Sequence, residues 1–291
     1  MSEFVVRVQD LRKTYRGGLE ALRGVSFDIR RGETFALLGP NGAGKSTVIE
    51  ILEGYRDRTG GEVSVLGVDP RRGGLGWKAR LGIVLQNTGE APTASVRELL
   101  GHFASFYPRP RDVDETIAAV GLTEKAKVSV RKLSGGQRRR VDVALGIIGR
   151  PELLFLDEPT TGFDPEVRRQ FWDLIRTLQA EGTTILLTTH YLDEAAELAE
   201  RAAILVGGEV ASVGRIEELG GPDARVPVVR WREGGTVRER RTENPGAVVA
   251  ELYGRLGEPS RLEVLRPSLE DVYLSFLGDE ARRTTAAGGL A

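Results

Sequence analysis

A glycine-rich segment between an apolar run and a helical pattern constrains this chain more than any other feature. The segment reads Gly39-Pro-Asn-Gly-Ala-Gly-Lys45-Ser46, with apolar residues at 35–38 before it and a helical pattern at 45–52 after it. This order of strand, loop and helix is the context in which GxxxxGK[ST] binds phosphate. Glycines let backbone N–H groups turn toward an anion, and the helix N-terminus adds positive potential. The pattern predicts a phosphate-binding loop, with Lys45 on the β and γ oxygens and the Ser46 hydroxyl on magnesium.

Two acids directly follow a second apolar run, at residues 153–156. A run of this kind is typical of a parallel strand buried on both faces, which would fix the position of both carboxylates. Asp157 is then placed to hold the magnesium shell. Glu158 can accept a proton from an attacking water, so we predict that Glu158 is the general base. The two motifs together indicate that the chain uses ATP and Mg²⁺.

The rest of the first 219 residues alternates between apolar runs and helical patterns. Residues 184–188 form another buried-strand run, and before it Asp164 suits a helix N-cap. Residues 87–150 are mostly helical, with helices expected at 96–107, 114–120 and 136–148. We therefore expect an α/β fold with a parallel sheet and a helical insertion.

The segment Leu133-Ser-Gly-Gly-Gln137, upstream of the acidic pair, resembles the signature motif of ABC ATPases. The other motifs occur in the order found in that family, over residues 3 to about 219. Tyr15 lies where the family has its adenine-stacking aromatic, Gln86 resembles the Q-loop glutamine, and His190 resembles the switch histidine. Residues 161–164 resemble the D-loop, with Phe163 where leucine is commoner in the family. The resemblance implies a P-loop NTPase core that binds and hydrolyses MgATP.

Each matched residue takes an expected role from this resemblance. The catalytic residues are expected to be Glu158, His190, Gln86 and Lys45, and the magnesium ligands Ser46, Gln86 and Asp157. The nucleotide is expected to contact Tyr15, Gly39, Pro40, Asn41, Gly42, Ala43, Gly44, Lys45, Ser46, Thr47, Gln86, Ser134, Gly135, Gly136, Gln137, Asp157, Asp164 and His190. In this family the signature N–H groups meet the nucleotide of the opposite subunit, so a second ATPase subunit, in an ATP-dependent homodimer, is an expected partner.

Two further features, a run of arginines and a histidine, are interpreted as structural rather than functional. Residues 138–140, three consecutive arginines, are interpreted as a solvated charged face of a helix. His102, one of only two histidines, is interpreted as a surface or packing residue in a predicted helix.

A composition change near residues 220–222 indicates a second, small α+β domain at 220–277. A hairpin is expected from strands at 226–232 and 236–241, followed by a helix at 245–256, a strand at 262–265 and a helix at 268–277. Residues 278–291 are small and polar and are expected to form a flexible tail. Residues 266–274 resemble the C-terminal segment of ATPases from bacterial drug and lipid exporters of the daunorubicin-resistance type.

The overall composition narrows the partners. The formal net charge is -1 and the chain has no cysteine, so we expect no nucleic-acid partner and favour the cytoplasm. No apolar run approaches the roughly 20 residues of a membrane span. The resemblance therefore implies attachment to the inner face of the cell membrane through a separate permease of about six spans per subunit. The predicted contact is a groove near Gln86 and the helix at 96–107.

Two other functions remain open from the sequence. One is a soluble ABC ATPase that acts on ribosomes or DNA, although such proteins usually carry two cassettes or a long coiled coil. The other is the ATPase of an importer. The exporter-like segment at 267–274 is the feature that distinguishes this chain from such an ATPase.

Overall fold

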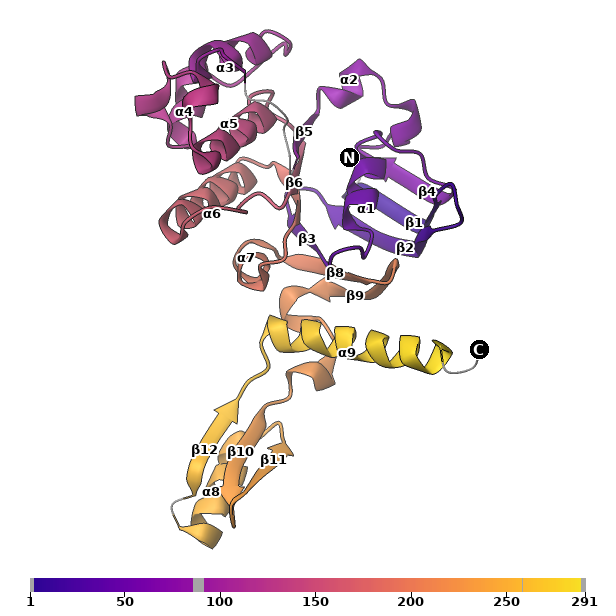
Figure 1. Ribbon diagram of the computed structural model, residues 1–291, viewed down its shortest axis with the longest axis vertical. Coiled ribbons are helices and arrows are strands. Elements are labelled where there is room, and N and C mark those ends of the chain that lie inside the picture. The colour runs from indigo at the N-terminus through magenta and orange to yellow at the C-terminus, as the bar shows by residue number, and fades with distance from the viewer. Residues whose placement is uncertain (1–2, 86–91, 258, 289–291) are drawn as a thin grey trace. The chain divides into compact units, whose positions relative to one another are not determined.

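The computed structural model describes residues 3–85, 92–257 and 259–288 (Figure 1). The chain divides into two compact units between Val213 and Gly214. This division comes a few residues before the limit expected at residue 219. Leu219 is buried, and a Cβ on Gly220 would lie 2.8 Å from Val272 of the last helix, so these residues pack with the second unit.

A six-stranded sheet forms the centre of the first unit and confirms the predicted α/β fold. Its order is β5-β6-β7-β3-β8-β9, and the pairs from β5 to β8 are parallel. The strands are β3 Thr34–Leu38, β5 Leu81–Val84, β6 Leu153–Asp157, β7 Thr184–Thr188, β8 Arg201–Val206 and β9 Glu209–Arg215. Because parallel strands end at the same edge, the segments after β3, β6 and β7 lie together.

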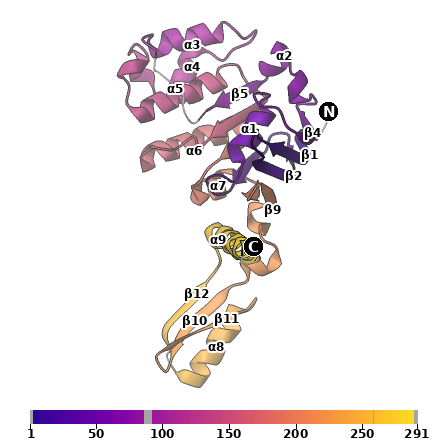
Figure 2. The ribbon, with the colours of Figure 1, turned by 45° about the vertical axis from the view of Figure 1, so that its right-hand side comes forward.

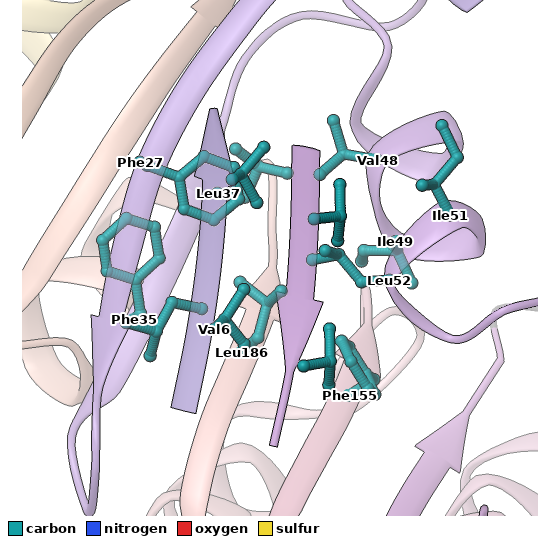
Figure 3. Close-up of a cluster of buried hydrophobic side chains, with 14 of the residues drawn as sticks. Val6, Phe27, Phe35, Leu37, Val48, Ile49, Ile51, Leu52, Phe155 and Leu186 are labelled. Atoms are coloured by element: carbon teal, nitrogen blue, oxygen red, sulfur yellow. The ribbon is translucent and has the colours of Figure 1, made fainter. Parts of the chain in front are cut away.

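A second sheet, of order β2-β1-β4, is antiparallel. It covers the side of helix α1 that faces away from the parallel sheet (Figure 1). Its strands are β1 Phe4–Thr14, β2 Glu20–Arg30 and β4 Gly60–Val65, and α1 is Lys45–Leu52. Figure 3 shows Val48, Ile49 and Leu52 pointing from α1 into the strands. The rings of Phe27 and Phe35 stack with centroids 5.5 Å apart. This core fixes the start of α1, and therefore the glycine-rich loop, against the parallel sheet.

The predicted helical insertion is present. It contains α3 Val96–Ala104, α4 Val113–Ala119 and α5 Gly135–Ile147, with 3₁₀ turns at Thr123–Lys125 and Val130–Lys132. These helices group together beside β5 in two views (Figures 1 and 2). Helix α3 ends at Ala104, before the predicted limit at residue 107, because the N–H groups of residues 106 and 107 bond carbonyls three residues back, as in a 3₁₀ turn.

The remaining elements of the first unit connect the strands. They are the 3₁₀ turn Pro70–Arg72, α2 Leu75–Lys78, α6 Pro165–Ala180 and α7 Leu192–Leu198. Asp164 caps α6 as predicted, since its side chain accepts a hydrogen bond of 2.9 Å from the Val167 N–H. No described helix combines the length and the apolar character that a bilayer span requires.

The second unit is a small α+β structure. Its sheet has the order β11-β10-β12, and its elements are β10 Val228–Glu233, β11 Thr236–Arg241, α8 Pro245–Leu256, β12 Ser260–Leu265 and α9 Leu269–Gly288, with 3₁₀ turns at Ile216–Glu218 and Pro222–Arg225. Val229, Trp231, Val248 and Leu252 form its core.

The last helix corrects the prediction that helix ends at residue 277. Helix α9 continues to Gly288, through much of the stretch expected to be a flexible tail. Residues 279–287 include alanine, arginine and glutamate and contain no proline or glycine, so their intrinsic helix propensity outweighs their lack of apolar character.

Candidate nucleotide site

The glycine-rich loop after β3 has a backbone that requires glycine. Gly39 and Gly44 have φ values of 154° and 103°, in a region that L side chains rarely adopt. A Cβ on Gly39 would lie 2.2 Å from the Leu205 carbonyl oxygen, and one on Gly44 would lie 2.8 Å from that of Ala21. The loop therefore packs directly on neighbouring backbone, which leaves its N–H groups at the start of α1 to meet an anion.

Lys45, the first residue of α1, folds back over this loop. Its Nζ donates hydrogen bonds to the carbonyl oxygens of Gly39 at 2.7 Å and Pro40 at 3.1 Å. Burial lowers the pKa of Lys45, and the negative charges of Glu158 and Asp157 act in the opposite direction. The ammonium group is thus held where it can neutralise phosphate oxygens on the loop.

The acidic pair lies at the end of β6, next to β7. The Thr188 hydroxyl donates to Asp157 Oδ1 at 2.5 Å, and the Glu158 N–H donates to both the carbonyl and the hydroxyl oxygen of Thr188 at 3.1 Å. Glu158 has φ 47°, a left-handed backbone that costs a non-glycine residue about 1 to 2 kcal/mol. Neighbouring strands therefore hold both carboxylates in place.

His190 follows β7 and meets the acidic pair. Its Nδ1 lies 3.5 Å from Glu158 Oε2, and its ring lies against that of Tyr191, with centroids 4.0 Å apart. The strand ends therefore bring together two of the predicted catalytic side chains.

Tyr15 lies beside the same loop. Its hydroxyl is 2.9 Å from the Thr47 hydroxyl, and the Arg56 guanidinium lies 5.0 Å from the ring centroid. Arg56 is itself ion-paired with Glu50 on α1. The ring is half-buried next to the predicted phosphate site, a position compatible with a contact to the nucleotide base.

The signature segment is engaged in helix capping and faces solvent. The Ser134 side chain accepts from the Gln137 N–H at 3.3 Å, and the Gln137 side chain accepts from the Ser134 N–H at 3.1 Å. Ser134 and Gly135 are exposed. The first turn of α5 is therefore exposed, and a helix N-terminus of this kind can bind an anion.

Gln86, predicted as a catalytic residue and magnesium ligand, lies outside the described residues. The other two predicted metal ligands, Ser46 and Asp157, offer a hydroxyl and a carboxylate. Mg²⁺ favours such oxygen ligands, and it usually needs few of them because phosphate and water complete its shell. In the described part of the chain no group of three or more His, Cys, Asp or Glu side chains is arranged to hold a metal. The donor set therefore suits Mg²⁺ bound together with a phosphate ligand.

The interpretation of residues 138–140 as a solvated face is wrong for Arg139, which is 8% exposed. Its guanidinium donates to main-chain carbonyls, including that of Asp157 at 2.6 Å. The helical spacing of the sequence could have revealed this burial, because Arg139 lies on the same helix stripe as the buried residues Val143 and Ile147. Thr188 is the second residue whose role the sequence did not reveal, since nothing in an apolar strand marks one hydroxyl as a partner of Asp157.

Glu53, at the end of α1, is an unusual buried acid. It is 7% exposed, and its Oε1 has no hydrogen-bond partner among the described residues. Burial, together with the charges of Asp157 and Glu50, raises the pKa of Glu53 to about 8.

Comparison with known proteins agrees with this geometry. The profile of the ABC transporter family matches residues 22–161. The chain is 34% identical to the daunorubicin resistance ATP-binding protein DrrA3 of Streptomyces coeruleorubidus, over 99% of this chain and 100% of that protein. It is 36% identical to the Nod factor export ATP-binding protein I of Rhizobium johnstonii, over 97% and 98%.

Solved structures resemble the first unit. Two structures of ABC transporter ATP-binding proteins serve as examples. One is an ATP-binding subunit of an ABC transporter, with a TM-score of 0.68 at 26% identity over 73% of this chain and 90% of that chain. The other, a dimeric post-hydrolysis cassette bound to ADP and Pi, scores 0.66 at 25% identity and covers 72% and 98%.

Proposed function

Since this chain belongs to the ABC transporter family as an ATP-binding subunit of the exporter type, we propose that it drives a separate permease through the site at the ends of β3, β6 and β7. The observation that carries the proposal is the meeting of Glu158 and His190 beside Asp157 and Thr188. The exporter names of the relatives favour export of a drug, a lipid or a related compound over import.

In the proposed reaction Glu158 accepts a proton from the water that attacks the γ-phosphate. Its side chain is only 14% exposed, and its main-chain N–H is fixed by Thr188, so the carboxylate has little freedom to move away. His190 is 44% exposed, lies 3.5 Å from that carboxylate, and contacts the γ-phosphate in the proposed reaction. Lys45 exchanges its hydrogen bonds with Gly39 and Pro40 for phosphate oxygens.

Mg²⁺ would be held by Ser46 and Asp157, and it would neutralise charge on the phosphates. Asp157 can do this without losing its orientation, because the Thr188 hydroxyl occupies one of its oxygens and leaves the other for the metal. Gln86 completes the proposed ligand set.

We further propose a homodimer in which Ser134, Gly135, Gly136 and Gln137 close over the ATP of the other subunit. The exposed first turn of α5 supports this arrangement. Asp164 caps α6 within its own chain. We therefore propose that its role at the dimer interface is to hold the D-loop, residues 161–164, in position.

The proposed permease contact is an apolar groove between β5 and the helical insertion. The groove has a volume of about 430 Å³, and its lining is mostly apolar but includes two charged residues: Lys78, residues 81–85, Phe103, Tyr107, Asp142, Leu145 and Gly146. Ile83, Leu85 and Phe103 are partly exposed there, and Phe106 beside Phe103 is 64% exposed. Exposed apolar side chains of this density mark binding surfaces. A short cytoplasmic helix of the permease would cover them, holding this subunit at the inner face of the membrane.

Lys45→Ala tests the core of the proposal. Loss of the ammonium charge should reduce ATP hydrolysis by the purified full chain at least about 100-fold without lowering its melting temperature appreciably. Hydrolysis at the parental rate would show that the glycine-rich loop is not the phosphate site.

A further inference from the structure

Arg139 is a buried arginine that holds the ends of two strands. Its Nε donates to the Pro159 carbonyl at 3.1 Å, and its Nη2 donates to those of Asp157 at 2.6 Å and Glu158 at 3.2 Å. Its Nη1 donates to the carbonyl of Leu85, just after β5. One side chain of α5 therefore contacts both the catalytic segment and the residue that precedes Gln86.

The guanidinium group suits this position for a geometric reason. These four acceptors are main-chain carbonyls, so hydrogen bonds compensate the cost of burying the guanidinium. Burial lowers the pKa of Arg139, against the opposite effect of Asp142, Asp157 and Glu158. The guanidinium is planar and carries five N–H donors in a rigid arrangement, so it can hold several carbonyls at fixed positions. The ammonium group of a lysine cannot do this.

The backbone of Glu158 is consequently held on both sides. Thr188 on β7 accepts its N–H, and Arg139 on α5 binds its carbonyl. This residue has φ 47°, a conformation that persists only where the surroundings impose it. Of the two residues that hold the Glu158 backbone, Arg139 is the one that belongs to the helical insertion.

We propose that Arg139 is a positioning residue that sets the geometry of Glu158 according to the orientation of α5. Helix α5 begins at the signature segment, so closure of that segment on ATP would also place Glu158 for catalysis. A helical insertion turned away would withdraw the donor from the Glu158 carbonyl. This inference rests on the proposed role of Glu158 as general base.

Variants of the full chain test the proposal. Arg139→Gln should lower kcat at least about tenfold, because small displacements of a catalytic group are costly, while the Kd for ATP changes less than about threefold. Arg139→Lys should retain more thermal stability than Arg139→Gln yet show a similar loss of kcat, since it keeps the charge without the fork. Arg138→Gln, the same change at the exposed neighbouring position, is the matched control and should keep the parental kcat.

A double-mutant cycle distinguishes positioning from general destabilisation. In single-turnover hydrolysis, Arg139→Gln added to Glu158→Gln should reduce the rate no further than Glu158→Gln alone, because Arg139 acts through that carboxylate. Independent losses that multiply would overturn the proposal. If Arg139→Gln does not fold, the same cycle is run with Arg139→Lys.

The outcomes also separate this inference from the proposed function. Parental hydrolysis by Glu158→Gln would reject Glu158 as the base, and with it both proposals. Slow hydrolysis by Glu158→Gln together with parental kcat in Arg139→Gln would reject the role of Arg139 alone.

Discussion

His190 Nδ1 lies 3.5 Å from Glu158 Oε2, where the ends of β6 and β7 meet. The carboxylate is the more enclosed partner, because its side chain is 14% exposed and that of His190 is 44% exposed. This contact joins residues from two segments far apart in the sequence, and in the proposed mechanism the attacking water is activated beside it.

His190→Ala should lower kcat for ATP hydrolysis about 100-fold and leave the Kd for ATP nearly unchanged, because the imidazole acts on the γ-phosphate and the water rather than on the base or sugar. Steady-state hydrolysis and a fluorescent-nucleotide titration measure the two quantities. His102→Ala, which removes the only other histidine, is the control and should hydrolyse ATP at the parental rate. Equal losses in both variants would contradict the assignment.

Glu158→Gln should bind ATP but hydrolyse it very slowly, since an amide cannot accept the proton of the water. The ATP-bound dimer should then accumulate, which size-exclusion chromatography with MgATP detects as a shift from monomer. Adding Ser134→Arg should restore the monomer by crowding the phosphates held by the other subunit. A dimer that forms without nucleotide and tolerates Ser134→Arg would refute the shared site.

Glu53 should make the folded chain less stable as the pH rises. Its folded pKa of about 8 lies above its ordinary value of 4.5, so the folded state binds more protons than the unfolded state between these values. The free energy of unfolding therefore falls across this window, and the loss is complete above about pH 8.

Glu53→Gln removes that titration and should raise the melting temperature more at pH 8 than at pH 5. Thermal unfolding at a series of pH values measures the difference. Glu50→Gln, on the same helix, is the comparison, because its partly exposed carboxylate is ion-paired with Arg56. An equal shift at both pH values in Glu53→Gln would show that its carboxyl is not buried in its neutral form.

Cysteine crosslinking tests the permease groove without background, because the chain has no native cysteine. A cysteine at Leu85 or Phe106 should crosslink to a cytoplasmic loop of the co-expressed permease, since both side chains are exposed beside the groove. Glu62→Cys, exposed on β4, should not. Crosslinks only from position 62, or only to ribosomal or DNA-bound proteins, would remove the transporter contact.

The glycine-rich loop, the acidic pair and the parallel α/β sheet could be predicted because each depends on local patterns of residues. Gly39 and Gly44 mark backbone that only glycine adopts easily, and the apolar runs before Lys45 and Asp157 mark strands buried on both faces. Only the folded structure showed that these segments meet, at the edge where the parallel strands β3, β6 and β7 end.

Only the tertiary structure decided how the acidic pair, Asp157 and Glu158, is held. In the sequence, Thr188 is one threonine in an apolar strand and Arg139 is one of three consecutive arginines, so each has many possible partners. The contacts that they make depend on how β7 and α5 pack against β6. The sequence by itself determined the fold, through backbone requirements and burial patterns that act over a few residues. The three-dimensional packing determined which carbonyls surround Arg139 and which hydroxyl reaches Asp157, because hydrogen-bond partners distant in sequence are chosen by geometry alone.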